Sequence, residues 1–308
     1  MSEKKINTPV LFLIFNRPDT TQRVFNEIRR AQPAQLFIAA DGPRDNRPDD
    51  IENCKKTREI IHHVDWDCKV STLFRDNNLG CKLAVSSAID WFFSQVDEGI
   101  ILEDDCVPDQ SFFPFCQELL ERYRNDERVM IISGDNFQFG KRRTEFSYYF
   151  SRFPHLWGWA SWKRAWHYYD VEMKLWPIIH DGDWLMDIFN DRDAVRYWNH
   201  ILEAAYNDKI DTWDYQWSFS CWIQGMLCIL PNTNLVSNIG FGQDASHTHN
   251  MRNPFAYMSV TPMQFPLNHP PFIIRDDRAD RFSQKTHFNP TTLISRTRHI
   301  FRHMFGRI

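Results

Sequence analysis

A short apolar run that ends in three consecutive carboxylates constrains this sequence more than any other feature. Residues 100–102 (Ile-Ile-Leu) form the run, which is typical of a strand buried on both faces of a mainly parallel sheet. Glu103, Asp104 and Asp105 follow it directly. Like charges this close repel and raise one another's pKa unless a cation neutralises them. The stretch therefore predicts an α/β sheet with a divalent metal at the C-terminal end of this strand.

Carboxylate oxygens in this position suit Mn²⁺ or Mg²⁺, because these hard cations keep several waters and share the rest of their shell with substrate phosphates. Ligands of open α/β sheets also bind at the C-terminal edge of the strands. The alternative interpretation of residues 103–105 is an acidic turn on the surface. The order of strands and helices around residues 103–105 favours the metal site over the surface turn.

The length and composition of the chain limit its class. Its 308 residues suffice for one large α/β domain or two small ones, with ample core. The formal net charge of −4 argues against broad nucleic-acid binding. Seven cysteines without a CxxC pair indicate reduced thiols and a cytoplasmic protein. Met1–Thr8 lacks the apolar core of a signal peptide, and no run approaches the ~20 apolar residues that span a bilayer.

Alternating strand and helix patterns precede the acidic strand, as expected for a doubly wound sheet. In the first unit we expect a helix capped by Asp19 or Thr20 that buries Val24, Phe25 and Ile28. Apolar runs predict strands over 9–15, 35–40, 69–74, 129–133, 146–150 and 227–230. Helical patterns cover 170–209 and 218–226.

Three polar side chains follow these strands and are candidates for nucleotide contacts. Arg17 lies in the loop after the first strand, where a guanidinium can hold a phosphate or stack on a base. Asp41 follows the second strand and can accept the N3 hydrogen of a uracil. Lys82 lies in the first turn of the third helix, where a cation opposes the helix dipole and so favours a ligand-facing role. The alternatives are a surface charge for Arg17 and turn formation for Asp41.

The second half of the chain carries a tryptophan-rich block and an isolated aspartate. Residues 152–162 hold three of the 12 tryptophans, broken by a glycine, which fits the wall of a sugar-binding cleft, although core packing explains most such rings. Asp214 lies between two tryptophans at the start of a predicted helix. It is a candidate N-cap and also a candidate general base, because apolar neighbours raise the pKa of a carboxylate. The polar loop 238–249 has the composition of a segment that closes over a ligand.

In this order, the elements resemble the GT-A nucleotide-sugar transferases, and most closely the family of the Golgi N-acetylglucosaminyltransferase that begins complex N-glycans. The resemblance runs from about Pro9 to His247. It implies that Asp105, backed by Glu103 and Asp104, ligates Mn²⁺. It also implies that Arg17 and Asp41 contact a UDP-sugar and that Lys82 lies near the nucleotide.

Two further motifs carry the resemblance. Arg152-Phe153-Pro154 with Trp157-Gly158-Trp159 is similar to the family's Phe-Pro-Gly-x-Gly-Trp block, which makes Trp159 a candidate sugar-nucleotide contact. Residues 213–217 (Trp-Asp-Tyr-Gln-Trp) are similar to its Trp-Asp-Asp-Trp, whose second Asp is the catalytic base. This chain has one Asp there, so Asp214 is the implied base, and Gln216 cannot replace a carboxylate. Ser246 and His247 match the loop that orders over the sugar nucleotide.

The resemblance implies a GT-A (Rossmann-like) fold with a mainly parallel sheet flanked by helices. We expect one large domain over 7–285, with a nucleotide-sugar and metal half at 7–108 and an acceptor half at 109–250. The predicted activity is metal-dependent, inverting transfer of a hexose or N-acetylhexosamine from a UDP-sugar to a hydroxyl of a glycan or glycolipid. The Golgi family's membrane anchor is absent from this sequence. Synthesis of a bacterial surface polysaccharide is the expected setting.

Residues 286–308 form the predicted C-terminal tail. From Arg281 onward the chain has no acidic residue, and arginines interleave with apolar residues at helical spacing. A basic amphipathic helix of this kind binds anionic membrane surfaces, which predicts peripheral contact with the inner face of the plasma membrane. The alternative is a helix that packs on its own domain or on a second subunit.

Two other functions fit part of the pattern. A sugar-nucleotide nucleotidyltransferase shares the sheet and the metal, but it needs a Gly-rich basic loop after the first strand, and residues 16–18 (Asn-Arg-Pro) are not one. A non-catalytic carbohydrate-binding protein on a transferase-like fold is compatible with the single Asp at position 214.

Overall fold

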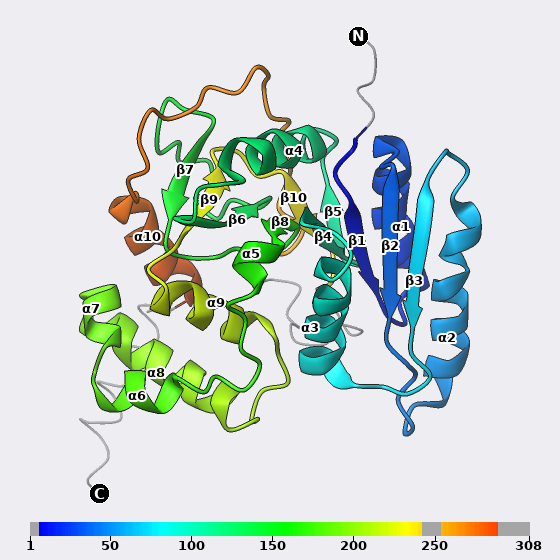
Figure 1. The fold of residues 1–308 in the computed structure, drawn as a ribbon, viewed down its shortest axis with the longest axis horizontal. Helices are drawn as coiled ribbons and strands as arrows, with labels where there is room; N and C mark the ends of the chain where they lie inside the picture. Colours follow the sequence, from blue (N-terminus) through cyan, green and yellow to red (C-terminus); the bar gives the residue numbers. More distant parts are fainter. Residues whose placement is uncertain (1–5, 242–253, 289–308) are drawn as a thin grey trace, which may run out of the picture.

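An eight-stranded sheet forms the centre of the computed structural model, which describes residues 6–241 and 254–288 (Figure 1). In spatial order its strands are β3 (Lys69–Phe74), β2 (Gln35–Ala40), β1 (Val10–Ile14), β4 (Glu98–Glu103), β8 (Trp159–Trp162), β6 (Val129–Ser133), β9 (Leu227–Pro231) and β7 (Tyr148–Ser151). The first four run parallel to one another. The strand β8 is antiparallel to both of its neighbours, so β6 and β9 again run in the direction of β4. This is a mainly parallel, Rossmann-like sheet, as the sequence predicted.

Some helices pack against this sheet, and others form a separate group beside it. They are α1 (Pro18–Ala31), α2 (Pro48–Arg58), η1 (Glu59–His63), α3 (Gly80–Phe93), α4 (Phe112–Tyr123), α5 (Lys163–Trp166), α6 (Trp176–Asp181), α7 (Leu185–Phe189), α8 (Arg192–Tyr206), α9 (Asp214–Ile223), α10 (Asp277–Ser283) and the π-helical turn η2 (Gln284–Phe288). Figure 1 shows α6, α7 and α8 gathered on the left, far from strands β1 to β3 on the right.

The described residues form two large hydrophobic cores, one around the sheet and one between helices. Strands β1 and β6 are buried along their whole length, as continuous runs of aliphatic residues require in a sheet covered on both faces. The main core joins the sheet to α1, α3 and α4. A second core between α6, α7, α8 and α9 is built mainly from aromatic rings, among them Trp176, Phe189, Trp198 and Trp222.

The first helix differs from the sequence expectation in its start. Asp19 or Thr20 was expected at the cap, but α1 begins at Pro18 with Arg17 in the cap position. Proline is favoured there because its fixed φ suits the first turn and its missing N–H would have no partner. As expected, Val24, Phe25 and Ile28 are buried.

A small second sheet shapes the loop after β4. Its strands β5 (Cys106–Pro108) and β10 (Val236–Asn238) pair antiparallel. The Ile239 amide donates to the Asp105 carbonyl at 2.8 Å. A Cβ on Gly240 would lie 2.0 Å from Asp105 Oδ2, so a larger residue there would displace the Asp105 side chain.

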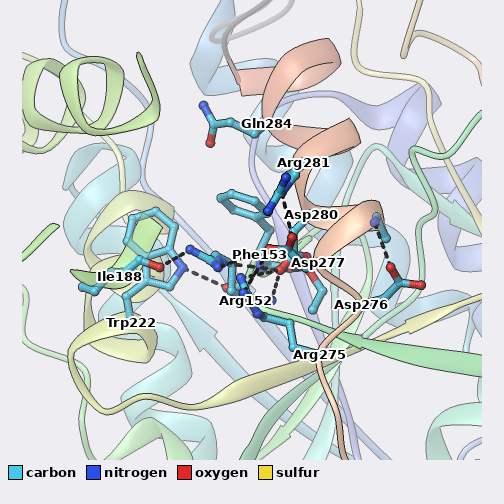
Figure 2. A network of polar contacts seen from close by, with 12 residues as sticks. Arg152, Phe153, Ile188, Trp222, Arg275, Asp276, Asp277, Asp280, Arg281 and Gln284 are labelled. Carbon is cyan, nitrogen blue, oxygen red and sulfur yellow. Dashed lines mark hydrogen bonds and ion pairs between the residues drawn. The ribbon is translucent and has the colours of Figure 1, made fainter. Parts of the chain in front are cut away.

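A network of polar contacts joins α10, in the last described segment, to the loop after β7 (Figure 2). Asp280 of α10 accepts from the Ser151 hydroxyl at 2.6 Å and forms ion pairs with Arg152 and Arg275 at 3.4 and 3.2 Å. Burial of a charged cluster is tolerated only when its members pair and hydrogen-bond, as they do here. This network anchors α10 against β7.

The element η2 runs past the predicted boundary at residue 285 to Phe288, whose ring packs on Trp198 with centroids 5.0 Å apart. The rest of the predicted tail, 289–308, lies outside the described residues. Among the described helices, none is both long and apolar enough to cross a bilayer.

Candidate active site

Two cavities meet at the end of β4. The first cavity, of about 380 Å³, is lined by four carboxylate side chains, those of Glu103, Asp105, Asp135 and Asp214. The second cavity, of about 360 Å³, is lined by polar residues that include Asp41, Arg44, Arg75 and Asn78. Arg17, Cys81 and Glu103 line both cavities. The acidic triplet therefore lies at the junction of two adjoining spaces, at the sheet edge that the sequence indicated.

Arg17 contacts two members of the acidic triplet. Its guanidinium hydrogen-bonds to the buried Asp104 carboxylate and lies 3.0 Å from Asp105 Oδ2. Burial alone would lower the pKa of Arg17, but the charges of Asp104 and Asp105 outweigh it and raise this pKa. Arg17 therefore lies beside the triplet as a fixed positive charge at the junction, and its predicted contact with a nucleotide stays a prediction.

The single positive charge of Arg17 does not neutralise the three carboxylates of the acidic triplet. Burial raises the pKa of Glu103 to about 8, and the charges of Asp105 and Asp104 add to the effect while Arg17 opposes it. A cation would relieve this repulsion. Among the described residues, no group of three or more His, Cys, Asp or Glu side chains is placed to hold a metal ion. Glu103 and Asp105 both line the first cavity and are the members of the triplet that could contribute carboxylate oxygens to a divalent cation there.

Asp214 is the first residue of α9 and lines the first cavity. Its Oδ1 accepts from the backbone amide of Tyr215 at 2.9 Å and from the hydroxyl of Thr212. These contacts fix the carboxylate at the positive end of the helix. Gln216 is fully buried and does not line the cavity. Asp214 thus supplies a carboxylate to the cavity wall, and Gln216 does not reach the wall.

The prediction that Trp159 contacts a sugar nucleotide is wrong in this arrangement. Trp159 is fully buried in β8 and stacks on Trp213 with ring centroids 5.7 Å apart. Trp162, on the opposite face of β8, is also buried, because the sheet is covered on both faces. Trp157, Trp198 and Trp213 line the first cavity instead.

Asp41 lines the second cavity and also holds the loop before α3. Its carboxylate accepts from the amide of Leu79 at 3.0 Å, from Asn78 Nδ2 at 2.8 Å and from the amide of Gly42 at 2.9 Å. Burial raises the pKa of Asp41, and these backbone donors oppose the shift. Asp41 therefore both stabilises the turn and lines the cavity.

Lys82 lies in the first turn of α3, as predicted, but not on the wall of either cavity. Its ammonium forms an ion pair with Asp208 at 2.6 Å, and its backbone amide donates to Asp211 at 2.8 Å. Lys82 lines neither cavity, whereas the neighbouring Cys81 lines both. The carboxylates of Asp208 and Asp211 explain the difference, because they lie beside the first turn of α3. Ser246 and His247, the two predicted loop contacts, lie outside the described residues.

Sequence reasoning missed Asp135, His155 and His287, all of which line the first cavity. Asp135 follows β6 as Asp41 follows β2, so the same pattern of a strand followed by a carboxylate could have found it. His155 lies in the tryptophan-rich block, whose predicted role in sugar binding was assigned to the tryptophans and not to this histidine. His287 comes from η2, and no local pattern connects it to a site.

Comparison with known proteins gives no family assignment. No family model matches the chain, and no curated protein matches it. The similar solved structures include mouse xyloside xylosyltransferase 1, 11% identical over 70% of this chain and 81% of that one, with a TM-score of 0.33. HddC from Yersinia pseudotuberculosis is 9% identical over 51% of this chain and 77% of that one, with a TM-score of 0.31.

The 4-diphosphocytidyl-2C-methyl-D-erythritol synthase from Anaerococcus prevotii is 6% identical over 51% of this chain and 72% of that one, also with a TM-score of 0.31. Likenesses this weak carry no argument about the reaction. The resemblance to the N-acetylglucosaminyltransferase family stays a prediction from the sequence.

Proposed function

We propose that this protein is a metal-dependent, inverting glycosyltransferase that moves a sugar from a UDP-sugar to a hydroxyl of a glycan or lipid-linked acceptor. One observation carries the proposal: two cavities adjoin at Arg17 and Glu103, and the wall of one of them holds both Asp105 and Asp214. A glycosyl transfer needs this combination, because charge develops on a leaving diphosphate while a proton leaves the acceptor.

In this proposal the second cavity takes the nucleotide. Asp41 accepts the N3 hydrogen of the uracil, and the guanidinium of Arg17 lies beside the diphosphate at the junction. Asp105, backed by Glu103 and Asp104, would hold Mn²⁺ or Mg²⁺, and the ion would supply positive charge to offset that of the leaving diphosphate. The sugar then extends into the first cavity, where Trp157 and Trp213 offer aromatic surface to its ring.

Asp214 is the proposed general base. The acceptor oxygen forms a bond to the anomeric carbon while its proton passes to the Asp214 carboxylate. The bond from the anomeric carbon to the phosphate oxygen breaks, and its electron pair leaves with UDP. Attack from the face opposite the leaving group inverts the anomeric centre. The Thr212 and Tyr215 contacts hold the carboxylate in one orientation for this step.

The test is release of UDP from a panel of UDP-sugars, with and without Mn²⁺ and with candidate glycan acceptors, on the wild type and on Asp105→Ala. We expect Mn²⁺-dependent release from one donor, lost in the variant. Asp65→Ala is the matched control, because Asp65 is an exposed carboxylate paired with Arg29 and lies in neither cavity. Absence of both turnover and metal-dependent nucleotide binding across the panel would leave residues 103–105 as an acidic turn. Metal-dependent release of pyrophosphate from UTP and a sugar phosphate would instead establish a nucleotidyltransferase.

The cellular setting rests on the sequence alone. A cytoplasmic enzyme of surface-polysaccharide synthesis, held at the membrane by residues 286–308, is the proposed arrangement. Flotation with anionic liposomes, comparing the full chain with a form cut at Asn289, tests this contact. Equal flotation of the two forms would favour packing of the tail on the protein itself.

A further inference from the structure

A buried Asp–His pair on the wall of the first cavity has no role in the steps above. Asp135 follows β6, and His155 lies in the loop between β7 and β8. His155 Nδ1 lies 3.1 Å from Asp135 Oδ1, with side-chain exposures of 0% and 1%. Burial raises the pKa of Asp135, and the charge of His155 opposes this shift. Both residues nevertheless line the cavity.

Each member of the pair retains an atom without a partner. Among the described residues, none hydrogen-bonds to His155 Nε2 or to Asp135 Oδ2, although both atoms are buried. A buried polar atom left unpaired costs about 1–3 kcal/mol, so such atoms ordinarily meet a ligand or a bound water. When the Nδ1 hydrogen of a neutral imidazole points to Asp135, Nε2 is an acceptor. The pair thus offers two acceptors to a ligand with neighbouring donors.

The surroundings of the pair suit the faces of a sugar ring. Phe137 stacks on His155 with ring centroids 4.4 Å apart, and His287 lies 4.7 Å from Phe137 on the same wall. The rings of Trp157 and Phe137 pack in a T-shaped arrangement with centroids 4.9 Å apart. Aromatic rings around a few fixed polar atoms are typical of a pocket for a polyhydroxylated ligand.

The position of the pair along the sheet edge separates it from the diphosphate. The strand β6 lies two strands from β4 in the sheet and ends at the same edge. Two strand spacings place Asp135 roughly 10 Å from Glu103 along this edge. A sugar whose phosphate lies at the junction therefore extends toward the pair.

We propose that Asp135 and His155 recognise the sugar of the donor by accepting hydrogen bonds from its hydroxyl groups, and that they select neutral sugars over acidic ones. The Asp135 carboxyl group lies directly against His155, so the site presents no unpaired positive charge to a ligand. The same wall holds Glu103, Asp105 and Asp214. A carboxylate on the sugar would therefore meet like charge. This inference rests on the proposed use of a UDP-sugar.

Binding measurements separate this inference from the proposed function. The Kd values of UDP, of a neutral UDP-hexose and of the matching UDP-hexuronic acid are measured with Mn²⁺ on the wild type, His155→Gln and Asp135→Asn. We expect the wild type to prefer the neutral sugar by at least about 10-fold. His155→Gln should weaken the neutral UDP-hexose about 10- to 100-fold and leave UDP unchanged. Asp135→Asn should reduce the preference for the neutral over the acidic sugar.

A matched control addresses folding. His269 also pairs with a carboxylate, Glu118 at 3.0 Å, but lies in neither cavity, so His269→Gln should change none of the three Kd values. Unchanged UDP-hexose binding in both pair variants would overturn the inference and leave the proposed function intact. Equal losses for UDP and UDP-hexose would also overturn it, because they indicate a structural role. A wild type that binds no nucleotide would overturn both.

Discussion

The two cavities are built differently, although they share Arg17 and Glu103. Residues 13–104 supply all but one of the residues that line the second cavity, and Asp211 is the exception. The first cavity draws its wall from positions between Arg17 and Phe288, nearly the whole described chain. The second cavity is thus a product of successive strand–loop–helix units. The first exists only when the two halves of the chain and the C-terminal segment pack together.

The same difference applies to what holds each wall in place. In the second cavity, Asp41 accepts hydrogen bonds from Asn78 and Leu79, which lie in the loop before α3 at the same edge of the sheet. In the first, η2 contributes His287 and Phe288, and α10 is fixed by the cluster of Arg152, Arg275 and Asp280 (Figure 2). We therefore expect substitutions in the two cavities to affect different observables.

The largest expected effect follows from Asp214→Asn. The amide keeps the size of the side chain and can still accept from Tyr215 N–H, but it cannot take a proton from the acceptor. We expect kcat to fall by about two to four orders of magnitude, the range for loss of a general base, with the Kd of UDP unchanged. Steady-state kinetics at saturating donor and calorimetric titration of UDP measure the two quantities. Comparable loss of both would show that the two cavities do not act separately.

The sequence was informative where the site depends on local order. Strands β2 and β3 had the bounds predicted for them, and Glu103–Asp105 lay at the predicted edge, because apolar runs and the residues that end them are local signals. Asp214 was predicted at a helix start and begins α9. Its neighbours Thr212 and Tyr215 were not part of that prediction.

The sequence failed where tertiary packing decides. Trp159 and Trp157 are both aromatic and two residues apart, yet one fills the core and the other lines the cavity. His287 follows α10, which is held by contacts between Arg152 and Asp280, two residues that are 128 positions apart in the chain. Such contacts have no periodicity to read, so composition and spacing could not predict them.

A pH dependence of stability distinguishes the assembled wall of the first cavity. Burial lowers the pKa of His287 to about 3, and His155 adds to the effect. The unfolded chain, with an ordinary histidine pKa near ~6.5, therefore binds a proton that the folded chain does not. Stability from this group is fully present above about pH 6.5 and is lost as the pH falls toward 3.

The variant His287→Phe isolates this effect, because it keeps an aromatic ring but cannot titrate. Between pH 7 and pH 4 we expect the wild type to lose on the order of 3 kcal/mol more unfolding free energy than the variant. Urea denaturation at a series of pH values measures the difference. Parallel pH profiles for the two proteins would mean that His287 is not buried in the aromatic wall.

A smaller effect is expected in the second cavity. Asp41→Ala removes the acceptor for the Leu79 and Asn78 groups, and we expect the Kd of UDP to rise about 10-fold with kcat at saturating donor unchanged. Asn78→Ala is the matched variant, because it removes a loop contact and keeps the carboxylate. If it weakens UDP as much as Asp41→Ala does, the loop that carries Asn78, rather than the Asp41 carboxylate alone, determines UDP binding.

The smallest effect should follow from Lys82→Ala, which tests a residue that lines neither cavity. Its partner Asp208 is 74% exposed, so their ion pair contributes only about 0.2–1 kcal/mol to stability. We expect the Kd of UDP to change by less than about 3-fold, as it should in Asp208→Ala. If Lys82→Ala weakens UDP by 10-fold or more while Asp208→Ala does not, the lysine leaves its ion pair to reach the nucleotide. The second cavity would then extend beyond its present wall, and the nucleotide-binding role implied by the family resemblance would be restored.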